Sequence, residues 1–390
     1  MQTETPMTKE VADWLEKREL IGGKDAVKDG RSFWLMVDAS AESRLDVMEW
    51  ILSIQPEIFR EKNAEGLTLF HQIAIQGHTD ALKFLAGKGA DINAENNSGY
   101  TPAGFAAQAG NIENVKCLAK LGADVSKREK RGLSLMDNAV LAGKTEVIKC
   151  LASLKVNVND CGGNGWTSLH WAAVTGQTES IKCLIELGAN IEARNTADDT
   201  PILMAAGKGQ IQSIKCLVSL GADIKTEAGL ILGLTAAEGQ VESIKCLVSL
   251  GADVNAVVQN GNGKTAIFFA AGAGQISCME CLISLGAHIT ATDDDGQTAM
   301  AFAITFGEDG DDIAGAVRLL LAKGQNANAI AKNGRSALHQ AARRGDVEIA
   351  KLLVSAGANA NTKDNEGKTP LDSANENGNT ALAQYLMALE

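Results

Sequence analysis

The sequence has 390 residues, of which 22% are charged and 45% hydrophobic, with a formal net charge of −12. An acidic chain is a poor candidate for non-specific binding to nucleic acid or anionic lipid, because both depend on cationic side chains meeting phosphates. The start of the chain lacks an apolar signal core, and no run of eighteen apolar residues occurs, so we expect neither secretion by a standard signal nor membrane insertion.

Glycine is abundant and the large residues are scarce: 40 Gly stand against five Pro and 4% aromatic residues. This balance indicates many short elements that each end at a glycine, rather than one core built on aromatic side chains.

The first 27 residues are expected to form an N-terminal capping helix. Thr5-Pro6 is a plausible helix start, and Val11, Trp14 and Leu15 make one apolar stripe. A repeat array is expected over residues 28–390, with a degenerate first repeat in which Asp29-Gly30-Arg31-Ser32 precedes an apolar helix that contains Val47, Trp50, Ile51 and Leu52.

A Gly-Ala-Asp/Asn triplet, or a worn version of it, recurs along the chain with a commonest step of 33 residues. The triplets begin at Gly89, Gly122, Lys155, Gly188, Gly221, Gly251, Gly286, Gly324 and Gly357. A second marker of the form Thr-Pro-Leu-His precedes most triplets, and it begins at Thr68, Thr101, Thr167, Thr200, Ser336 and Thr369.

Each part of the repeat has a physical interpretation. The Thr can cap the first helix, and a pair such as Ala172-Ala173 leaves that helix slim enough for close approach by the next repeat. Gly176 ends the first helix, and Gly188 supplies a left-handed cap for the second. The short, turn-rich segment before the next Thr fits a projecting β-hairpin. Because no repeat can bury its apolar face alone, stability must come from stacking.

The full pattern, G-x-T-P-L-H-x-A-A-x-x-G followed by L-L-x-x-G-A-D, closely resembles the ankyrin repeat. Residues 165–194 match it nearly position by position, and the resemblance covers roughly residues 28–390. It implies an all-α repeat solenoid of about ten helix-turn-helix repeats with projecting β-hairpin loops and terminal caps. The last unit, residues 363–390, would be the C-terminal cap.

Two steps depart from this period. The 30-residue step reads TEAGLILGLTAAEG, which predicts a shortened hairpin and therefore a notch or a bend. The 38-residue step carries an acidic insertion, residues 307–312, between its two helices.

Several residues resemble parts of catalytic, nucleotide-binding or calcium-binding motifs, but their positions are explained better by the repeat. Three of the five histidines, His71, His170 and His339, fall in the Thr-Pro-Leu-His slot, which implies a hydrogen-bonding role between hairpin and helix. Gly-Lys-Thr occurs at 143–145, 263–265 and 367–369 without the earlier glycine of a phosphate loop. Asp293-Asp294-Asp295-Gly296 begins like a calcium loop, but Phe302 occupies the position of the bidentate Glu.

Six of the eight cysteines stand five residues before a triplet, where other repeats hold Phe or Leu, so we expect packed thiols. They are Cys117, Cys150, Cys183, Cys216, Cys246 and Cys281. Layers stacked about 10 Å apart would keep them too distant for disulfides, which predicts a reducing, cytoplasmic setting. Cys278 and Cys281 form a lone Cys-x-x-Cys pair without a second ligand pair. We expect no catalytic residue, no cofactor and no metal site.

The resemblance to ankyrin repeats implies that a partner protein binds at the hairpin tips and the exposed side of the first helices. The slots on this surface hold the candidate contact residues Tyr100, Lys130, Arg131, Trp166, Val174, Thr175, Asp199, Lys208, Lys264, Asp294, Asp295, Gln297, Phe306, Arg335, Arg343 and Arg344. Trp166 lies at a hairpin tip, where an exposed Trp is either a contact residue or a locally packed one. Trp171 is expected to occupy a core slot.

Charge alternates along these slots. Lys127, Arg128, Lys130 and Arg131 form a basic tip, Asp293–Asp295 an acidic one, and Arg335, Arg343 and Arg344 a second basic region. This layout either fixes the register of a partner or consists of ordinary solvated tips.

The sequence favours a monomeric, non-enzymatic scaffold, adaptor or inhibitor that binds another protein and neither nucleic acid nor a membrane interior. A bacterial effector, delivered into a host cell by a specialised route and binding host proteins there, fits the same residues. An enzyme with an unrecognised site and an assembly protein that stacks end to end are the remaining alternatives.

Overall fold

The computed structural model describes residues 6–18, 31–259, 261–308 and 310–389. Thr5, Asp29 and Gly30, which figure in the sequence predictions, lie outside these residues. The chain divides into two compact units, Met1–Asp198 and Asp199–Glu390, and we treat each unit by itself.

The first unit consists of a short N-terminal helix followed by five helix pairs in its described residues. Its elements are α1 (Lys9–Glu16), α3 (Ser32–Ala41), α4 (Leu45–Ile54), the 3₁₀ helix η1 (Ile58–Arg60), α5 (Leu69–Gln76), α6 (Thr79–Gly87), α7 (Pro102–Ala109), α8 (Ile112–Lys120), α9 (Leu135–Leu141), α10 (Thr145–Ser153), α11 (Ser168–Val174) and α12 (Thr178–Glu186).

The second unit consists of six helix pairs in the residues that the structure describes. They are α13 (Pro201–Gly207), α14 (Ile211–Ser219), α15 (Ala228–Ala237), α16 (Val241–Ser249), α17 (Ala266–Gly272), α18 (Ile276–Ser284), α19 (Ala299–Phe306), α20 (Ile313–Ala322), α21 (Ala337–Arg344), α22 (Val347–Ser355), α23 (Pro370–Glu376) and α24 (Thr380–Met387). The described part of the chain contains no strand, so the predicted all-α repeat fold is confirmed with eleven helix pairs.

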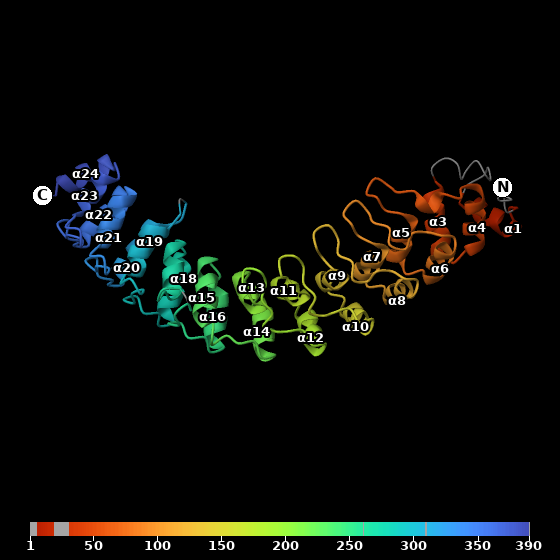
Figure 1. The fold of residues 1–390 in the computed structure, drawn as a ribbon, viewed down its shortest axis with the longest axis horizontal. Coiled ribbons are helices and arrows are strands. Elements are labelled where there is room, and N and C mark those ends of the chain that lie inside the picture. The colour runs from red at the N-terminus through yellow and green to blue at the C-terminus, as the bar shows by residue number, and fades with distance from the viewer. Residues whose placement is uncertain (1–5, 19–30, 260, 309, 390) are drawn as a thin grey trace. The chain divides into compact units, whose positions relative to one another are not determined.

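Within each unit the first helices of successive pairs contact one another, as do the second helices (Figure 1). α5 contacts α7 and α7 contacts α9, while α6, α8 and α10 form the parallel row behind them. The alanine pairs lie at the first-helix contacts: Ala172 and Ala173 of α11 and Ala341 and Ala342 of α21 are fully buried. Their small side chains allow the close approach that the sequence predicts.

The first helices begin at capped residues. The Thr101 and Thr200 hydroxyls accept the backbone N–H of Gly104 and Leu203, each three residues further on. Such a bond satisfies one of the amides that a helix start leaves unpaired.

The histidine of this capping slot joins the helix to the next loop. His71 Nδ1 accepts the N–H of Thr68 at 3.1 Å, so Nε2 carries the proton and donates to the carbonyl of Tyr100 at 3.0 Å. His339 makes the same two bonds, with Ser336 and Lys368. His170 Nδ1 likewise accepts the N–H of Thr167. The hydrogen-bonding role that the resemblance implies for these histidines is confirmed.

The loops that precede the first helices, here called finger loops, are tight turns closed by a backbone bond between their first and last residues. The finger loops closed in this way are residues 63–67, 96–100, 129–133, 162–166, 293–297, 331–335 and 364–368, and the Val258 N–H likewise donates to the Lys264 carbonyl. Gly165 shows why a glycine stands at the tip: its φ is +74°, and a Cβ there would lie 2.8 Å from the backbone nitrogen of Thr196.

α1 begins at Lys9, with the Thr8 side chain accepting the Val11 N–H, so the expected start at Thr5-Pro6 is wrong. Val11, Trp14 and Leu15 are buried as expected, and Trp14 Nε1 donates to Glu42 at 2.7 Å. The division into a cap at 1–27 and an array at 28–390 stays a prediction.

Both irregular steps take the local form that their sequences suggest. α15 begins at Ala228, and only a short turn held by the Asp223 carboxylate precedes it, so this repeat lacks a full finger loop. The acidic insertion joins α19 to α20, where the Asp312 side chain caps α20 by accepting the Gly315 N–H at 2.7 Å.

The buried histidines make stability depend on pH. Burial lowers the pKa of His71 and of His339 below the usual 6.5, so the folded state binds a proton less readily than the unfolded chain does. The stability that these two neutral histidines add to the folded state is complete above about pH 6.5. It is lost as the pH falls towards their lowered pKa in the folded protein. We expect the free energy of unfolding, measured in urea, to drop by on the order of 1 kcal/mol between about pH 7.5 and pH 5.5. The His71→Gln/His339→Gln variant should lose less over this range, and an unchanged slope would contradict the assignment.

Glu129 opens a finger loop at the position where four of the other finger loops have Asn or Asp. In those four loops the short side chain bonds two amides: Asn96 Oδ1, for example, accepts the N–H groups of Ser98 and Tyr100 at 3.0 and 2.9 Å. The longer Glu129 side chain is only 7% exposed, and neither of its oxygens has a hydrogen-bond partner among the described residues. Burial raises the pKa of Glu129, while the nearby Tyr100 hydroxyl donates to Asn138 Oδ1 at 3.4 Å.

We therefore expect Glu129→Asn to stabilise the protein at neutral pH by about 1–2 kcal/mol, because it removes a buried carboxylate and restores two amide bonds. Urea unfolding measures the change. Glu129→Gln is the matched control, since it removes the charge without restoring the turn and should give the smaller gain. A loss of stability in the Asn variant would show that the carboxylate has a favourable role.

Candidate functional site

A groove runs between α19 and α21, and both the finger loops and the inter-helix loop contribute to its walls. It contains two adjoining hollows that share Thr305, Gln340 and Arg343. The hollow on the finger side has a volume of about 480 Å³ and is lined by Asp295, Gln297, Thr305, Phe306, Lys332, Asn333, Gln340 and Arg343. The other measures about 470 Å³ and is lined by Ile304, Thr305, Gly307, Glu308, Gln340, Arg343 and Arg344. We call the two together the α19–α21 groove.

The groove brings together five of the residues that the sequence singled out: Asp295, Gln297, Phe306, Arg343 and Arg344. Sequence reasoning missed Lys332, Asn333, Thr305 and Gln340. Asn333 directly precedes the finger glycine Gly334, as the candidate contact residues Arg131 and Asp295 precede theirs. The repeat pattern could therefore have identified Asn333 as a further candidate. Gln340 lies four residues after the helix cap, a slot that the sequence analysis had assigned to the core.

Phe306 supplies the exposed apolar surface of the groove. It is the last residue of α19 and its side chain is 59% exposed. Its ring packs on Phe302, with centroids 4.9 Å apart, and Phe302 in turn contacts Phe269 of α17. A large aromatic ring left in water at a concave surface is a favourable place for a partner's apolar side chain.

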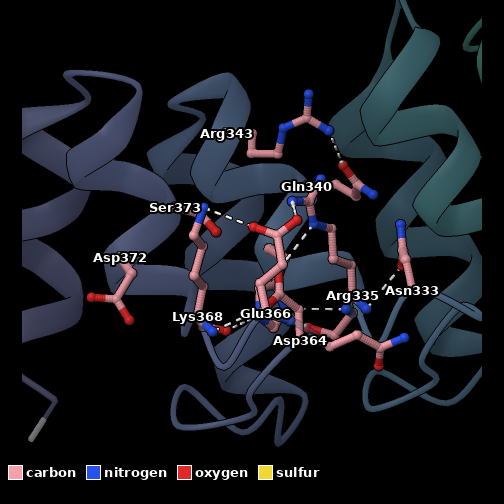
Figure 2. Close-up of polar contacts among 12 residues, drawn as sticks. Asn333, Arg335, Gln340, Arg343, Asp364, Glu366, Lys368, Asp372 and Ser373 are labelled. Atoms are coloured by element: carbon pink, nitrogen blue, oxygen red, sulfur yellow. Dashed lines mark hydrogen bonds and ion pairs between the residues drawn. The ribbon is translucent and has the colours of Figure 1, made fainter.

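Arg343 is the principal cation of the groove. Its exposed guanidinium makes one hydrogen bond, from Nη1 to Gln340 Oε1 at 3.3 Å, and Gln340 itself is only 6% exposed (Figure 2). No carboxylate in the described part of the chain pairs with Arg343. Lys332, at the tip of the adjacent finger loop, is exposed and likewise has no ion-pair partner among those residues.

Arg335, by contrast, belongs to an ion-pair network at the base of the fingers (Figure 2). Its Nε donates to Asp364 Oδ2 at 3.2 Å, and Lys368 pairs with Glu366 and with Glu376, each at 2.9 Å. Burial alone would raise the pKa of Asp364, but the bonds from the Lys368 N–H and from Arg335 outweigh it and leave that pKa lowered. Arg335 thus holds two finger loops together.

Arg344 also has a structural function. Its Nη1 donates to the carbonyls of Ile304, at 3.4 Å, and Gly307, which lie at the end of α19. These bonds tie α21 to the inter-helix loop, while Arg343, one residue earlier, faces the groove.

Two of the four cations in the basic tip of the first unit are paired with carboxylates of that unit. Lys127 pairs with Glu95 at 2.5 Å, and Arg128 pairs with Asp137 and Asp160. Lys130 Nζ donates to the Asn97 carbonyl at 2.8 Å. Arg131 is exposed at the tip. Lys127 and Arg128 are thus neutralised, whereas Lys130 and Arg131 have no carboxylate at ion-pair distance among the described residues.

Trp166 packs against Trp171, with ring centroids 4.3 Å apart. Trp166 lies just before the Thr167 cap and Trp171 is the fourth residue of α11, so the pair forms a hydrophobic staple across the helix start. Tyr100 and Phe105 repeat this arrangement at α7, at 5.3 Å. The expectation that Trp171 lies in a core slot is wrong: like Trp166 it is half-buried, because its slot faces the finger loop.

The remaining predicted contact residues lie apart from the groove. Thr175 is exposed, but its hydroxyl donates to the Trp171 carbonyl at 2.6 Å, and Val174 and Asp199 are half-buried. Lys264 lies 5.4 Å from the ring centre of Phe302 and 3.7 Å from the buried carboxylate of Asp293.

Two further residues lie in loops or at helix ends away from the hollows. Asp294 is exposed, and its backbone N–H bonds the Asn262 carbonyl. Lys208 lies 4.0 Å from Glu238.

No cluster of three or more His, Cys, Asp or Glu side chains that could hold a metal ion occurs among the described residues. All eight cysteines are free, and the six in the repeated slot are buried on the second helices. Burial raises the pKa of the Cys278 thiol to about 11, which makes it an unreactive packed group. None of the described helices has the length and apolarity that crossing a bilayer requires.

The family model for ankyrin repeats (3 copies) matches the chain four times, over residues 35–129, 135–228, 232–314 and 308–390. The chain belongs to the ankyrin-repeat family. Members of this family generally act as protein-interaction modules. No curated protein sequence matches this ankyrin-repeat chain.

The different roles of the adjacent arginines can be tested by stability. Arg344→Ala leaves two carbonyls without their donor and should lower the free energy of unfolding by about 1 kcal/mol or more. Arg343→Ala removes an exposed side chain with one weak bond and should change it by less than about 0.5 kcal/mol. Urea unfolding of the two variants measures the difference. Equal losses would show that Arg343 also supports the fold.

Proposed function

We propose that this ankyrin-repeat protein is a non-enzymatic scaffold, adaptor or inhibitor that binds a partner protein in the α19–α21 groove. The observation that carries the proposal is the pairing, in one hollow, of a well-exposed aromatic ring with a guanidinium that has no carboxylate partner among the described residues. Aromatic and Arg side chains are enriched among residues that dominate binding energy at protein interfaces. Of the nearby cations, Arg335 and Lys368 are held in ion pairs and Arg344 bonds two carbonyls, so these three fix the scaffold. Lys332 is exposed beside Arg343 in the same hollow.

The polar groups that resemble catalytic residues support the same proposal, because the repeat already uses them. His71 and His339 are neutral, buried and bonded at both ring nitrogens. The thiols of the repeated slot lie in packed positions, where burial raises the pKa of, for example, Cys117 and Cys150.

A reducing, cytoplasmic setting is proposed on the same basis. Eight free thiols, seven of them buried, are compatible with a compartment in which disulfides do not form.

Quantitative affinity capture from the native cell tests the proposed function. The wild-type chain and the Phe306→Ser/Arg343→Glu variant are used as bait, and bound proteins are measured by mass spectrometry. We expect at least one protein to be retained by the wild type and reduced about tenfold or more by the variant, the loss typical of central interface residues.

Lys323→Glu, at the end of α20, is the control because it makes the same change of charge away from the groove. Circular dichroism must show equal helicity in all three chains. The proposal fails if no protein is retained above a bead control, or if the groove variant retains the same proteins to the same extent.

A further inference from the structure

We infer that the α19–α21 groove binds an extended segment of its partner in which a carboxylate side chain lies next to a large apolar one. This inference rests on the proposed function and adds the chemistry of the segment. The carboxylate would bind Arg343, and the apolar side chain would cover Phe306.

The carboxylate is indicated by the unused capacity of Arg343. A guanidinium has five N–H donors in a planar fork, and Arg343 uses one of them, on the neutral amide of Gln340 at 3.3 Å. A carboxylate can accept two parallel bonds from such a fork. The nearly buried Gln340 orients the exposed guanidinium of Arg343 through this one bond and leaves its other donors available.

The apolar neighbour is indicated by Phe306, which lines the same hollow as Arg343. The ring is supported from below by Phe302 at 4.9 Å and leaves most of its surface in water. An aliphatic or aromatic side chain placed there would remove apolar surface from water on both molecules.

The remaining charges of the finger-side hollow favour an acidic occupant and orient it. Lys332 and Asp295 lie on neighbouring finger tips, joined by the bond from the Lys332 N–H to the Asp295 carbonyl at 2.8 Å. The lining of this hollow thus contains two cations, Lys332 and Arg343, and one carboxylate, Asp295. In the second hollow Glu308 adds negative charge and Arg344 is bonded to carbonyls, so the partner's carboxylate fits better on the finger side.

The size of the hollows favours a segment over a folded domain. Each measures less than about 500 Å³, which is room for a few side chains. Asp295 and Glu308 would also repel a phosphate backbone along the groove, which argues for a peptide rather than a nucleic acid.

Selection from a library of random linear peptides, displayed on phage and panned against the full chain, tests the inference directly. We expect enriched peptides to carry Asp or Glu beside Phe, Tyr, Trp, Leu, Ile or Met. Affinities are then measured by fluorescence anisotropy with the enriched peptide and with its Asp→Asn or Glu→Gln counterpart.

Arg343→Glu and Phe306→Ser should each weaken binding about tenfold or more, and Arg343→Lys should weaken it several-fold because it loses the bidentate fork. Lys323→Glu should bind as the wild type does. Removing the carboxylate from the peptide should have an effect in the wild type but not in Arg343→Ala.

Four results would overturn the inference: enriched peptides without a carboxylate, binding unaffected by Arg343→Glu, competition for the groove by a single-stranded oligothymidylate, or no enriched peptide at all. The proposed function is tested separately by capture of intact proteins. If captured proteins depend on the groove but selected peptides do not, only the inference about the segment fails; if neither depends on it, the proposed function fails as well.

Discussion

The close contact of one first helix with the next is the constraint on which the rest of the structure depends. A single helix pair has two short helices and cannot bury its apolar face alone, so each repeat is stable only because its neighbours cover it. Fully buried alanines at these contacts, such as Ala172 and Ala341, let the helix backbones approach closely. The arrangement also uses reactive side chain types as structural groups: His71, for example, bonds the helix cap and the next loop.

The same constraint decides which surface residues are available to a partner. Long cationic side chains on the fingers reach the adjacent repeat and find carboxylates there, as Arg128 does with Asp160 and Arg335 with Asp364. A cation stays available only where the adjacent repeat offers no carboxylate within reach. Arg343 is such a case: its one hydrogen bond goes to the neutral amide of Gln340 on its own helix, and no carboxylate in the described part of the chain pairs with it.

The fold was predictable from the sequence because the same residue pattern recurs in most repeats. The spacing of Thr68, His71 and Gly77 alone identifies the cap, its buried histidine and the end of the first helix. Individual side-chain partners were less predictable, since they depend on residues about 30 positions away in the adjacent repeat. Arg343 and Arg344 look equivalent in the sequence, yet one faces the groove and the other bonds the end of α19.

Sequence reasoning also misplaced Trp171, for a related reason. Its slot on α11 is apolar in several repeats, as a core slot would be, but it packs against the residue before the helix cap and stays half-buried. The groove itself could not have been predicted. It depends on Thr305 and the nearly buried Gln340 lying beside an exposed Phe306, which only the arrangement of α19 and α21 reveals.

We propose that partners bind on the first-helix side of the second unit, in the groove between α19 and α21. Hydrogen–deuterium exchange, measured by mass spectrometry with and without a protein captured from the native cell, tests it most directly. We expect slower exchange in segments 295–308 and 332–344, with little change in α20 and α22. Protection confined to those second helices, or to the finger loops of the first unit, would contradict it.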